Sequence, residues 1–377
     1  MTACLFGTYD RDHSANRLLR LALAGAGFAV RELHEPLGGA AHLRSRSLAR
    51  LVARWAGAAR RLARRWRAVG GSPPLVVVGF GGQLDVLLAR ALCRPRAGLV
   101  FAPLVGLVET LVDDRGVFRP GGAWARALGA LDRWTLRAAD LVLADTASHA
   151  ACFAEQGAPA ERLGVWHLGA EPEFLVPQAA AARGRRVLFY GTCLPLHGVE
   201  TIIAAAAELG SRAEVVLLGD GPERVRLEAL ARELRAPVTW RAPVPLAALP
   251  AELAAAAVAL GVFGGGRKAA VVVPNKVYQA AAAGRPLVTR DGPGLREVLE
   301  PGVHCLACPP ADPAALAAAI ARLLDDPALA ARLGRAARAR VLERFAPERQ
   351  AAALAALLRE RLGLVAAEEA PRRAADA

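Results

Sequence analysis

Short apolar runs alternate with amphipathic helical patterns along most of the chain. The apolar runs occupy residues 3–6, 28–33, 75–80, 98–102, 140–145 and 163–168, and then 186–191, 214–219, 238–242, 258–263, 285–290 and 304–308. Strands that alternate with helices form βαβ units, which build a mostly parallel sheet. The pattern therefore predicts an α/β protein.

The number of runs indicates two sheets rather than one. A chain of 377 residues exceeds the size of one ordinary core, and the runs fall into two sets on either side of a stretch rich in Pro, Ala and Gly. We predict an N-terminal Rossmann-like domain (1–170), a linker (171–185), a second Rossmann-like domain (186–345) and a terminal segment (346–377). The terminal segment is expected to hold a helix that packs back on the N-terminal domain, followed by a disordered tail. Two doubly wound domains would face a central cleft, where ligands bind at the carboxyl ends of the strands.

Composition narrows the class of protein. The formal net charge is +13, which indicates anionic partners. The six cysteines are scattered rather than arranged as a disulfide framework, which favours a reducing cytosol. The N-terminus has no secretory pattern and no stretch reads as a membrane span. The sequence predicts a cytoplasmic protein, with contact to the inner face of the membrane as an addition.

A basic segment suggests where such contact could occur. Residues 44–67 carry nine arginines, and Leu51, Trp55, Leu62 and Trp66 interleave with them at roughly helical spacing. A basic amphipathic helix with Trp is typical of a protein that lies on an anionic membrane surface. The alternative is that the apolar stripe packs on the sheet and the arginines are solvated. Nucleic-acid binding is not expected, because no recognition motif accompanies the charge.

The only two lysines of the chain, Lys268 and Lys276, lie close together. Lys268 follows Arg267 and the glycine run 264–266, and Lys276 follows Pro274 and Asn275. Pro and Asn favour a helix start, with Asn275 as the cap. Two cations, a glycine loop and a helix N-terminus all attract anions, so the segment predicts a diphosphate site. The alternative is a surface loop with solvated charges.

Two further loops follow predicted strands in the same domain. The first, "FYGTCLPLHGVET", contains Gly191, Thr192, His197 and Gly198. The second, "LLGDGPE", contains Gly219, Asp220 and Gly221. A glycine turn before a helix offers backbone N–H groups to a phosphate. Each is also an ordinary βα turn when taken alone.

The N-terminal domain supplies candidate residues for a second substrate. They lie in the loop after the first strand and in the segment 108–116, and they are Gly7, Tyr9, Asp10, His13, Asp113 and Asp114. Asp113 or Asp114 could orient an acceptor hydroxyl; helix capping and surface ion pairs are the alternative. Asp10 and Asp12 form a D-x-D string, and Cys305 and Cys308 form half a zinc motif, but we expect no metal at either place.

The second half of the chain resembles the glycosyltransferases of the GT-B fold, in particular family 4. The segment "QAAAAGRPLVTRDGPGLREVLEPGVHCLACPP" is similar to the part of that family that ends the donor site. The two glycine loops resemble further family elements. The resemblance implies a GT-B fold, transfer of a sugar from a nucleotide-diphosphate donor to a hydroxyl acceptor, retention of anomeric configuration, and no metal or other cofactor. The alternatives are a non-catalytic protein that binds a nucleotide or a partner, and a sugar-nucleotide epimerase.

Four positions depart from the family pattern. Thr192 and His197 stand where the family has Arg and Lys, and Val271 and Gln279 stand at its two glutamates. The resemblance assigns the second glutamate to a ribose hydroxyl, a role that the Gln279 carbonyl could keep. We predict that Lys268, Arg267 and Lys276 replace the missing phosphate cations, with Lys268, Arg267 and Asp114 as the catalytic set.

Overall fold

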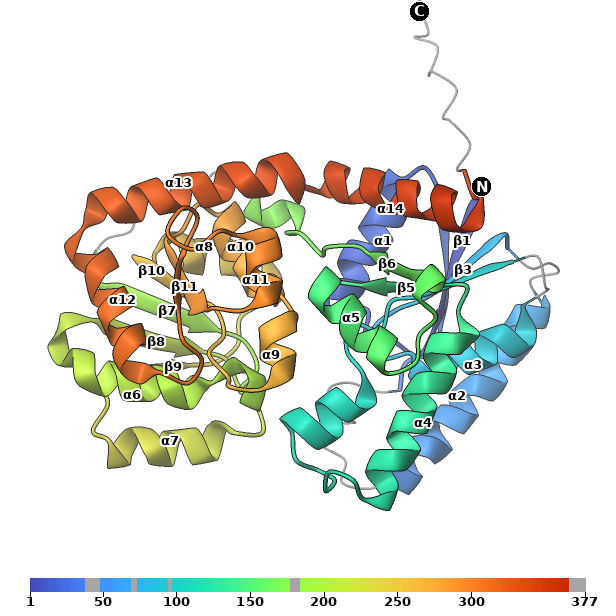
Figure 1. The fold of residues 1–377 in the computed structure, drawn as a ribbon, viewed down its shortest axis with the longest axis horizontal. Helices are drawn as coiled ribbons and strands as arrows, with labels where there is room; N and C mark the ends of the chain where they lie inside the picture. Colours follow the sequence, from blue (N-terminus) through green and yellow to red (C-terminus); the bar gives the residue numbers. More distant parts are fainter. Residues whose placement is uncertain (38–47, 69–72, 94–96, 177–183, 366–377) are drawn as a thin grey trace, which may run out of the picture.

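The computed structural model describes residues 1–37, 48–68, 73–93, 97–176 and 184–365. It contains two six-stranded parallel sheets side by side (Figure 1). The strand order is β2-β1-β3-β4-β5-β6 in the first sheet and β12-β11-β10-β7-β8-β9 in the second. The predicted α/β architecture of two doubly wound domains is confirmed.

The N-terminal domain is built on the first sheet. Its strands are β1 (Thr2–Gly7), β2 (Ala29–His34), β3 (Leu75–Val78), β4 (Gly98–Phe101), β5 (Leu141–Ala144) and β6 (Leu163–Val165). Its helices are α1 (Ser14–Gly25), α2 (Leu48–Ala68), α3 (Gln83–Leu92), the π-helix η2 (Glu109–Asp114), α4 (Ala123–Ala138) and α5 (Ala147–Glu155). Helices cover both faces, so strands such as β3 are apolar at every position rather than at alternate ones.

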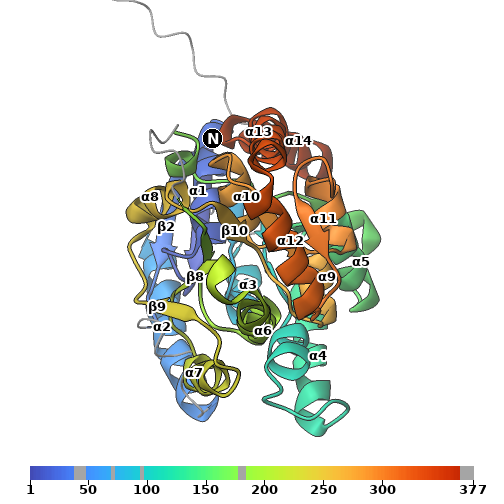
Figure 2. The same cartoon turned by 90° about the vertical axis from the view of Figure 1, so that its left-hand side faces the viewer.

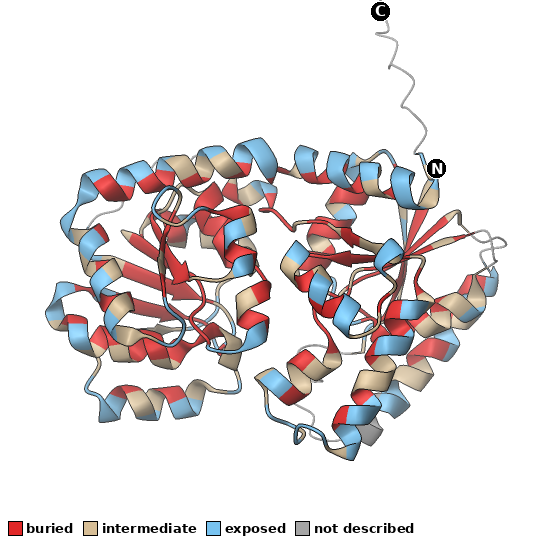
Figure 3. Ribbon diagram, in the orientation of Figure 1, coloured by how far each residue is buried: buried red, intermediate tan, exposed pale blue. Residues whose placement is uncertain are grey.

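The C-terminal domain repeats this arrangement. Its strands are β7 (Arg186–Tyr190), β8 (Glu214–Leu218), β9 (Val238–Arg241), β10 (Val258–Leu260), β11 (Leu287–Arg290) and β12 (Leu306–Cys308). Its helices are α6 (Val199–Leu209), α7 (Arg224–Glu233), α8 (Leu249–Ala254), α9 (Arg267–Val271), α10 (Asn275–Ala282), α11 (Pro293–Val298), α12 (Pro313–Asp325) and α13 (Pro327–Arg344). The strands form the buried centre of each domain (Figure 3).

The last helix, α14 (Pro347–Leu362), returns to the N-terminal domain and packs against α1. Figures 1 and 2 show α13 and α14 along one side of both domains. A Cβ on Gly25 would lie 2.9 Å from the Ala351 Cβ, so the two helices approach closely. The Trp166 indole N–H donates to the Gln350 carbonyl (3.0 Å). The two domains are therefore linked on one side by a packed helix, and the expected disordered tail lies outside the described residues.

Helix α2 uses its apolar side chains in the core. Leu62 is fully buried, and the Trp66 ring packs edge-on against Phe6 (5.7 Å). The Trp55 indole N–H donates to the buried Asp85 carboxylate (2.8 Å). These side chains are therefore not available to a membrane surface, and arginines remain exposed on the outer side. Residues 44–47 and the side chains of 48–51 lie outside the described part.

Candidate active site

Three loops meet at the carboxyl ends of β7, β8 and β10. The Cys193 N–H donates to the Asp220 carbonyl (2.9 Å), which joins the first two loops. The Phe263 N–H donates to the His197 carbonyl (3.0 Å), which joins the first and third. The structure thus brings the glycine loops together at one edge of the sheet, as parallel strands require.

Two glycines allow this close approach. Gly198 has φ +60° at the start of α6, and a Cβ there would lie 2.5 Å from the Gly264 nitrogen. Gly219 has φ +153°, and its Cβ would lie 2.0 Å from the Gly191 carbonyl oxygen. A side chain at either position would collide with backbone, so these glycines are required by the geometry of the loops.

Lys276 lies beneath the loop that begins at Gly191. Its ammonium is 4.0 Å from the centre of the Phe189 ring, and a Cβ on Gly191 would lie 3.0 Å from it. The residue is 6% exposed, and its Nζ has no hydrogen-bond partner among the described residues. Burial lowers the pKa of Lys276 to about 7. The structure therefore holds a buried cation without an anion, directly under a glycine loop.

Asn275 does not cap α10 as the sequence predicted. The extended residue before the helix is Pro274, and it makes no side-chain cap. Pro274 has ψ +146°, outside the helical range, so it occupies the N-cap position and Asn275 is the first helical residue. The buried Asn275 Nδ2 has no acceptor among the described residues. A second unpaired donor therefore stands beside Lys276 in sequence.

His197 holds the first loop rather than supplying a charge. Its Nδ1 donates to the Thr192 carbonyl, and burial together with nearby Lys276 keeps its pKa well below the ordinary value. The ring is therefore neutral at pH 7 and fixes the loop in shape. The Thr192 residue itself is exposed.

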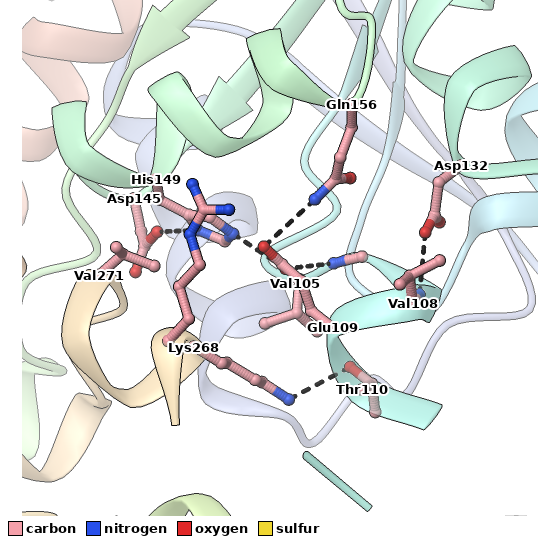
Figure 4. Close-up of polar contacts among 12 residues, drawn as sticks. Val105, Val108, Glu109, Thr110, Asp132, Asp145, His149, Gln156, Lys268 and Val271 are labelled. Atoms are coloured by element: carbon pink, nitrogen blue, oxygen red, sulfur yellow. Dashed lines mark hydrogen bonds and ion pairs between the residues drawn. The ribbon is translucent and has the colours of Figure 1, made fainter. Parts of the chain in front are cut away.

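Lys268 points to the N-terminal domain (Figure 4), and Arg267 forms an ion pair with a residue of that domain. The Lys268 ammonium lies 3.5 Å from an Asp114 carboxylate oxygen and donates to the Thr110 hydroxyl (3.2 Å). This pair is largely buried, and burial lowers the pKa of Lys268. Arg267 pairs with Glu155 at an exposed position, and Asp113 is exposed. The structure thus places Lys268 and Asp114 together across the domain boundary.

Gln279 lies in a buried polar network. The Tyr190 hydroxyl donates to its carbonyl oxygen (2.9 Å), and its amide donates to the Glu171 carboxylate (2.9 Å). Both ends of the side chain are therefore bonded to protein in this conformation. Contact with a ribose hydroxyl would require the Gln279 carbonyl to share its acceptor capacity with Tyr190.

The structure contains a buried acid–histidine–acid cluster that was not predicted from the sequence. His149 Nδ1 lies 2.7 Å from the Asp145 carboxylate and Nε2 lies 3.2 Å from that of Glu109 (Figure 4). Burial opposes the charged ring, but the two carboxylates outweigh it and raise the pKa of His149 to about 9. Asp145 and His149 are spaced i, i+4 after a predicted strand, which was the one available signal.

This cluster joins the two domains. The second Asp145 oxygen accepts from the Val273 N–H (3.2 Å), and the Thr146 hydroxyl donates to the Val271 carbonyl (2.7 Å). At the start of α5, the N–H groups of Ala147 (2.6 Å) and Ser148 (2.8 Å) donate to the carboxylate of Glu297 in α11. The segment between Lys268 and Lys276 is therefore fixed by hydrogen bonds to the residues just before α5.

We expect His149→Gln to change how stability depends on pH. The unfolded histidine titrates near 6.5, whereas the folded one titrates near 9. Between these values the native state binds the extra proton, so its stabilisation is complete below pH 6.5 and is lost as pH rises through 9. Urea unfolding of both proteins from pH 6 to 9.5 measures this. A wild-type advantage that stays constant over that range would contradict the assignment.

The acceptor-side candidates surround the end of β1. The Tyr9 hydroxyl donates to Glu32 (3.0 Å), and the His13 Nδ1 caps α1 by accepting from Ala15 N–H (3.3 Å). Burial lowers the pKa of His13 to about 4. Asp10 is exposed, and a Cβ on Gly7 would lie 2.6 Å from an Asp85 oxygen.

A residue not predicted from sequence fixes this loop. The Asn16 amide donates to the Asp10 carbonyl (2.8 Å), and its oxygen accepts from the Phe80 N–H (2.8 Å). Beside it lies a polar cavity of about 400 Å³, lined in part by Tyr9, Arg17 and Glu32. The lining also includes Arg11, Asp12 and Arg20, so charged side chains of both signs face this cavity beside the predicted acceptor loop.

Neither a metal site nor a membrane span is found among the described residues. In those ranges no group of three or more His, Cys, Asp or Glu side chains is arranged to hold a metal ion. Cys305 and Cys308 are buried free thiols. No helix of the described part is long and apolar enough to cross a bilayer.

Comparisons with known proteins agree with the predicted fold. The family model described as Glycosyl transferases group 1 matches residues 184–326. The alpha-D-kanosaminyltransferase of Streptomyces kanamyceticus is 34% identical over 159 residues, which are 39% of this chain and 38% of that protein. The match therefore spans less than two fifths of this curated relative.

Solved structures match over nearly the full length. Sucrose-phosphate synthase from Thermosynechococcus elongatus superposes with a TM-score of 0.77 at 21% identity, covering 96% of this chain and 99% of that one. Anabaena HepE in complex with UDP and glucose superposes with a TM-score of 0.71 at 17% identity, covering 95% and 99%. At these identities the likeness establishes the fold alone.

Proposed function

We propose that this chain, whose residues 184–326 belong to the group 1 glycosyl transferases and whose whole length has the GT-B fold, transfers a sugar from a nucleotide-diphosphate donor to a hydroxyl acceptor. The observation that carries the proposal is the buried ammonium of Lys276 beneath the Gly191 loop, which has no hydrogen-bond acceptor among the described residues. A buried cation without a partner is costly, so its presence indicates an anion that arrives with a ligand.

The diphosphate is the natural anion for this place. The loops after β7, β8 and β10 present backbone to one point, and α6 begins there with its positive dipole end. As the sugar leaves, negative charge develops on the diphosphate, and fixed donors stabilise it without reorganising. Lys276 would be protonated by this charge, because an adjacent anion raises the pKa of an ammonium.

Lys268 and Asp114 are proposed to act at the sugar end of the cleft. They form a largely buried pair that spans the two domains. In the proposed reaction Asp114 orients the acceptor hydroxyl and Lys268 balances charge beside it, while the domains exclude water from the donor. Arg267 serves as a surface contact to Glu155. Retention of the anomeric configuration is proposed from the family resemblance, and NMR of the product anomer tests it.

We expect Lys268→Ala and Arg267→Ala to differ sharply. Loss of Lys268 leaves the largely buried Asp114 without its counterion, so kcat/KM for the donor should fall about tenfold or more. The Arg267 pair is 64% and 58% exposed, so its loss should change kcat/KM by less than about threefold. Steady-state kinetics with matched donor and acceptor measure both. Equal losses would contradict the separate roles.

A second function, nucleotide or partner binding without transfer, is favoured by one observation. Val271 packs into an apolar cluster with Val105, Cys152 and Val272, where the family resemblance implies a carboxylate that contacts the sugar. Such a protein would bind a nucleoside diphosphate tightly and consume no donor. Chromatography of donor sugars after long incubation with varied acceptors separates the two functions.

A further inference from the structure

Helix α4 has two apolar faces, and only one of them is covered. The inner face buries Ala125, Leu128 and Leu136 against the domain. The outer face carries Trp124, Ala127, Leu131 and Trp134, at steps of three or four residues. Trp124 is 57% exposed and Trp134 64%. In Figure 3 the ribbon of α4, at the edge of the N-terminal domain, includes exposed residues.

The loop before α4 extends this apolar surface. Val117 is 57% exposed, and the Phe118 ring stacks on Trp124 (5.8 Å between centres). In Figure 1 this loop lies at the end of the N-terminal domain that is remote from α14. A monomer rarely exposes two tryptophans and a neighbouring valine together, so the surface indicates a binding partner.

The positive charge of α4 and of the loop before it indicates the kind of partner. Residues 115–139 hold five arginines, Arg115, Arg119, Arg126, Arg133 and Arg137, and one acid, Asp132, which is buried. Among the described residues, none of the recorded ion pairs involves these arginines; Arg126 and Arg137 donate to backbone carbonyls instead. The surface therefore combines exposed indole rings with uncompensated positive charge.

We infer that the outer face of α4, with Val117 and Phe118, docks on an anionic membrane surface. Tryptophan favours the boundary between headgroups and acyl chains, and each arginine near an anionic leaflet adds about 1 kcal/mol. A second copy of this chain is the poorer occupant, because a symmetric contact would set these arginines against each other. The inference concerns binding alone and stands apart from sugar transfer.

Docking on this face would bring the end of η2 close to the membrane. Asp114, at the end of η2, lies only three residues before Val117 in sequence and contacts Lys268. An acceptor carried in the bilayer would therefore reach the N-terminal wall of the cleft by a short path. Leu62 and Trp66 of α2 are buried, so this helix would contribute to membrane binding only through the charge of its exposed arginines.

Vesicle co-sedimentation tests the inference without any donor sugar. The probes are vesicles of phosphatidylcholine alone and of phosphatidylcholine with 30% phosphatidylglycerol. We expect the wild type to bind the anionic vesicles, with weaker binding at 0.5 M salt. Trp124→Ser/Trp134→Ser and Arg126→Glu/Arg133→Glu should each weaken binding about tenfold or more. The control Val225→Ser/Arg232→Glu changes exposed residues of α7 and should bind as wild type.

Three results would overturn the inference. The first is that the wild type binds both kinds of vesicle equally, or binds neither. The second is loss of binding only in Arg60→Glu/Arg64→Glu, which would assign it to exposed arginines of α2. The third is a concentration-dependent dimer that Trp124→Ser/Trp134→Ser dissociates, measured by light scattering. Because the altered side chains are exposed, unchanged melting temperatures confirm that each variant is folded.

Discussion

Gly198→Ala is expected to abolish sugar transfer and to lower the free energy of unfolding by about 3 kcal/mol or more. The new Cβ would lie 2.5 Å from the Gly264 nitrogen and the Phe263 carbonyl carbon, so backbone must move. That movement separates the two loops that build the proposed diphosphate site. Urea unfolding and donor turnover measure the two effects.

Gly363→Ala is the matched control. Gly363, after the end of α14, also has a left-handed backbone, with φ +65° and ψ +17°, but a Cβ there meets nothing within 4 Å. It should therefore cost only the intrinsic conformational penalty, about 1–2 kcal/mol, and leave kcat/KM unchanged. If both alanine variants lost the same stability and both kept activity, the site would not depend on contact between the loops that contain Gly198 and Gly264.

Lys276→Met is expected to move stability and activity in opposite directions. Removing a buried ammonium without a partner should raise the free energy of unfolding of the ligand-free protein by on the order of 1–3 kcal/mol. It should also lower kcat/KM for the donor about 100-fold or more, because a cation at the developing charge is lost. Arg335→Met, at an exposed site on α13, should change neither.

The stability gain of Lys276→Met should depend on pH with a defined sign. The unfolded lysine titrates near 10.5 and the folded one near 7, so the unfolded state binds more protons between these values. Lys276 therefore destabilises the wild type increasingly as pH falls from 10.5, and fully below 7. The advantage of the variant should be largest near pH 7 and vanish near pH 10.5. A constant difference would show that Lys276 is not buried as described.

Much of the fold was predictable because each domain repeats a simple pattern. The run 75–80 contains β3 and the run 140–145 contains β5. Strands buried on both faces read as continuous apolar stretches, which are easy to find. The run 258–263 overshoots β10, because Val262 and Phe263 are buried beneath the glycine loop after the strand has ended.

The site was predictable only to the level of its loops. Parallel strands bring their following loops together, which located Gly191, Gly219 and Lys276 in one region. The direction of Lys268 could not be predicted, because its partner Asp114 belongs to the other domain. The pairing of Glu109 with His149 was hidden for a different reason: both lie in the N-terminal domain, but forty residues separate them in sequence.

The sequence left two interpretations of the apolar stripe of α2 open and gave no prediction for α4, for one physical reason. An apolar stripe in the sequence of a helix does not determine whether that face packs in the core or is exposed to solvent. Helix α2 has one apolar stripe, and its residues Leu62 and Trp66 are buried in the core. Helix α4 has a second stripe with Trp124 and Trp134, which only the tertiary structure shows to be outside.

The central claim is that a nucleoside diphosphate binds over Lys276. The most direct measurement is a thermal-shift titration of wild type and Lys276→Met with UDP, GDP, ADP, dTDP and CDP. The account predicts that one of them raises the melting temperature of the wild type in proportion to the logarithm of its excess, and leaves that of the variant nearly unchanged. Equal shifts in the two proteins, or no shift in the wild type with any of the five, would contradict it.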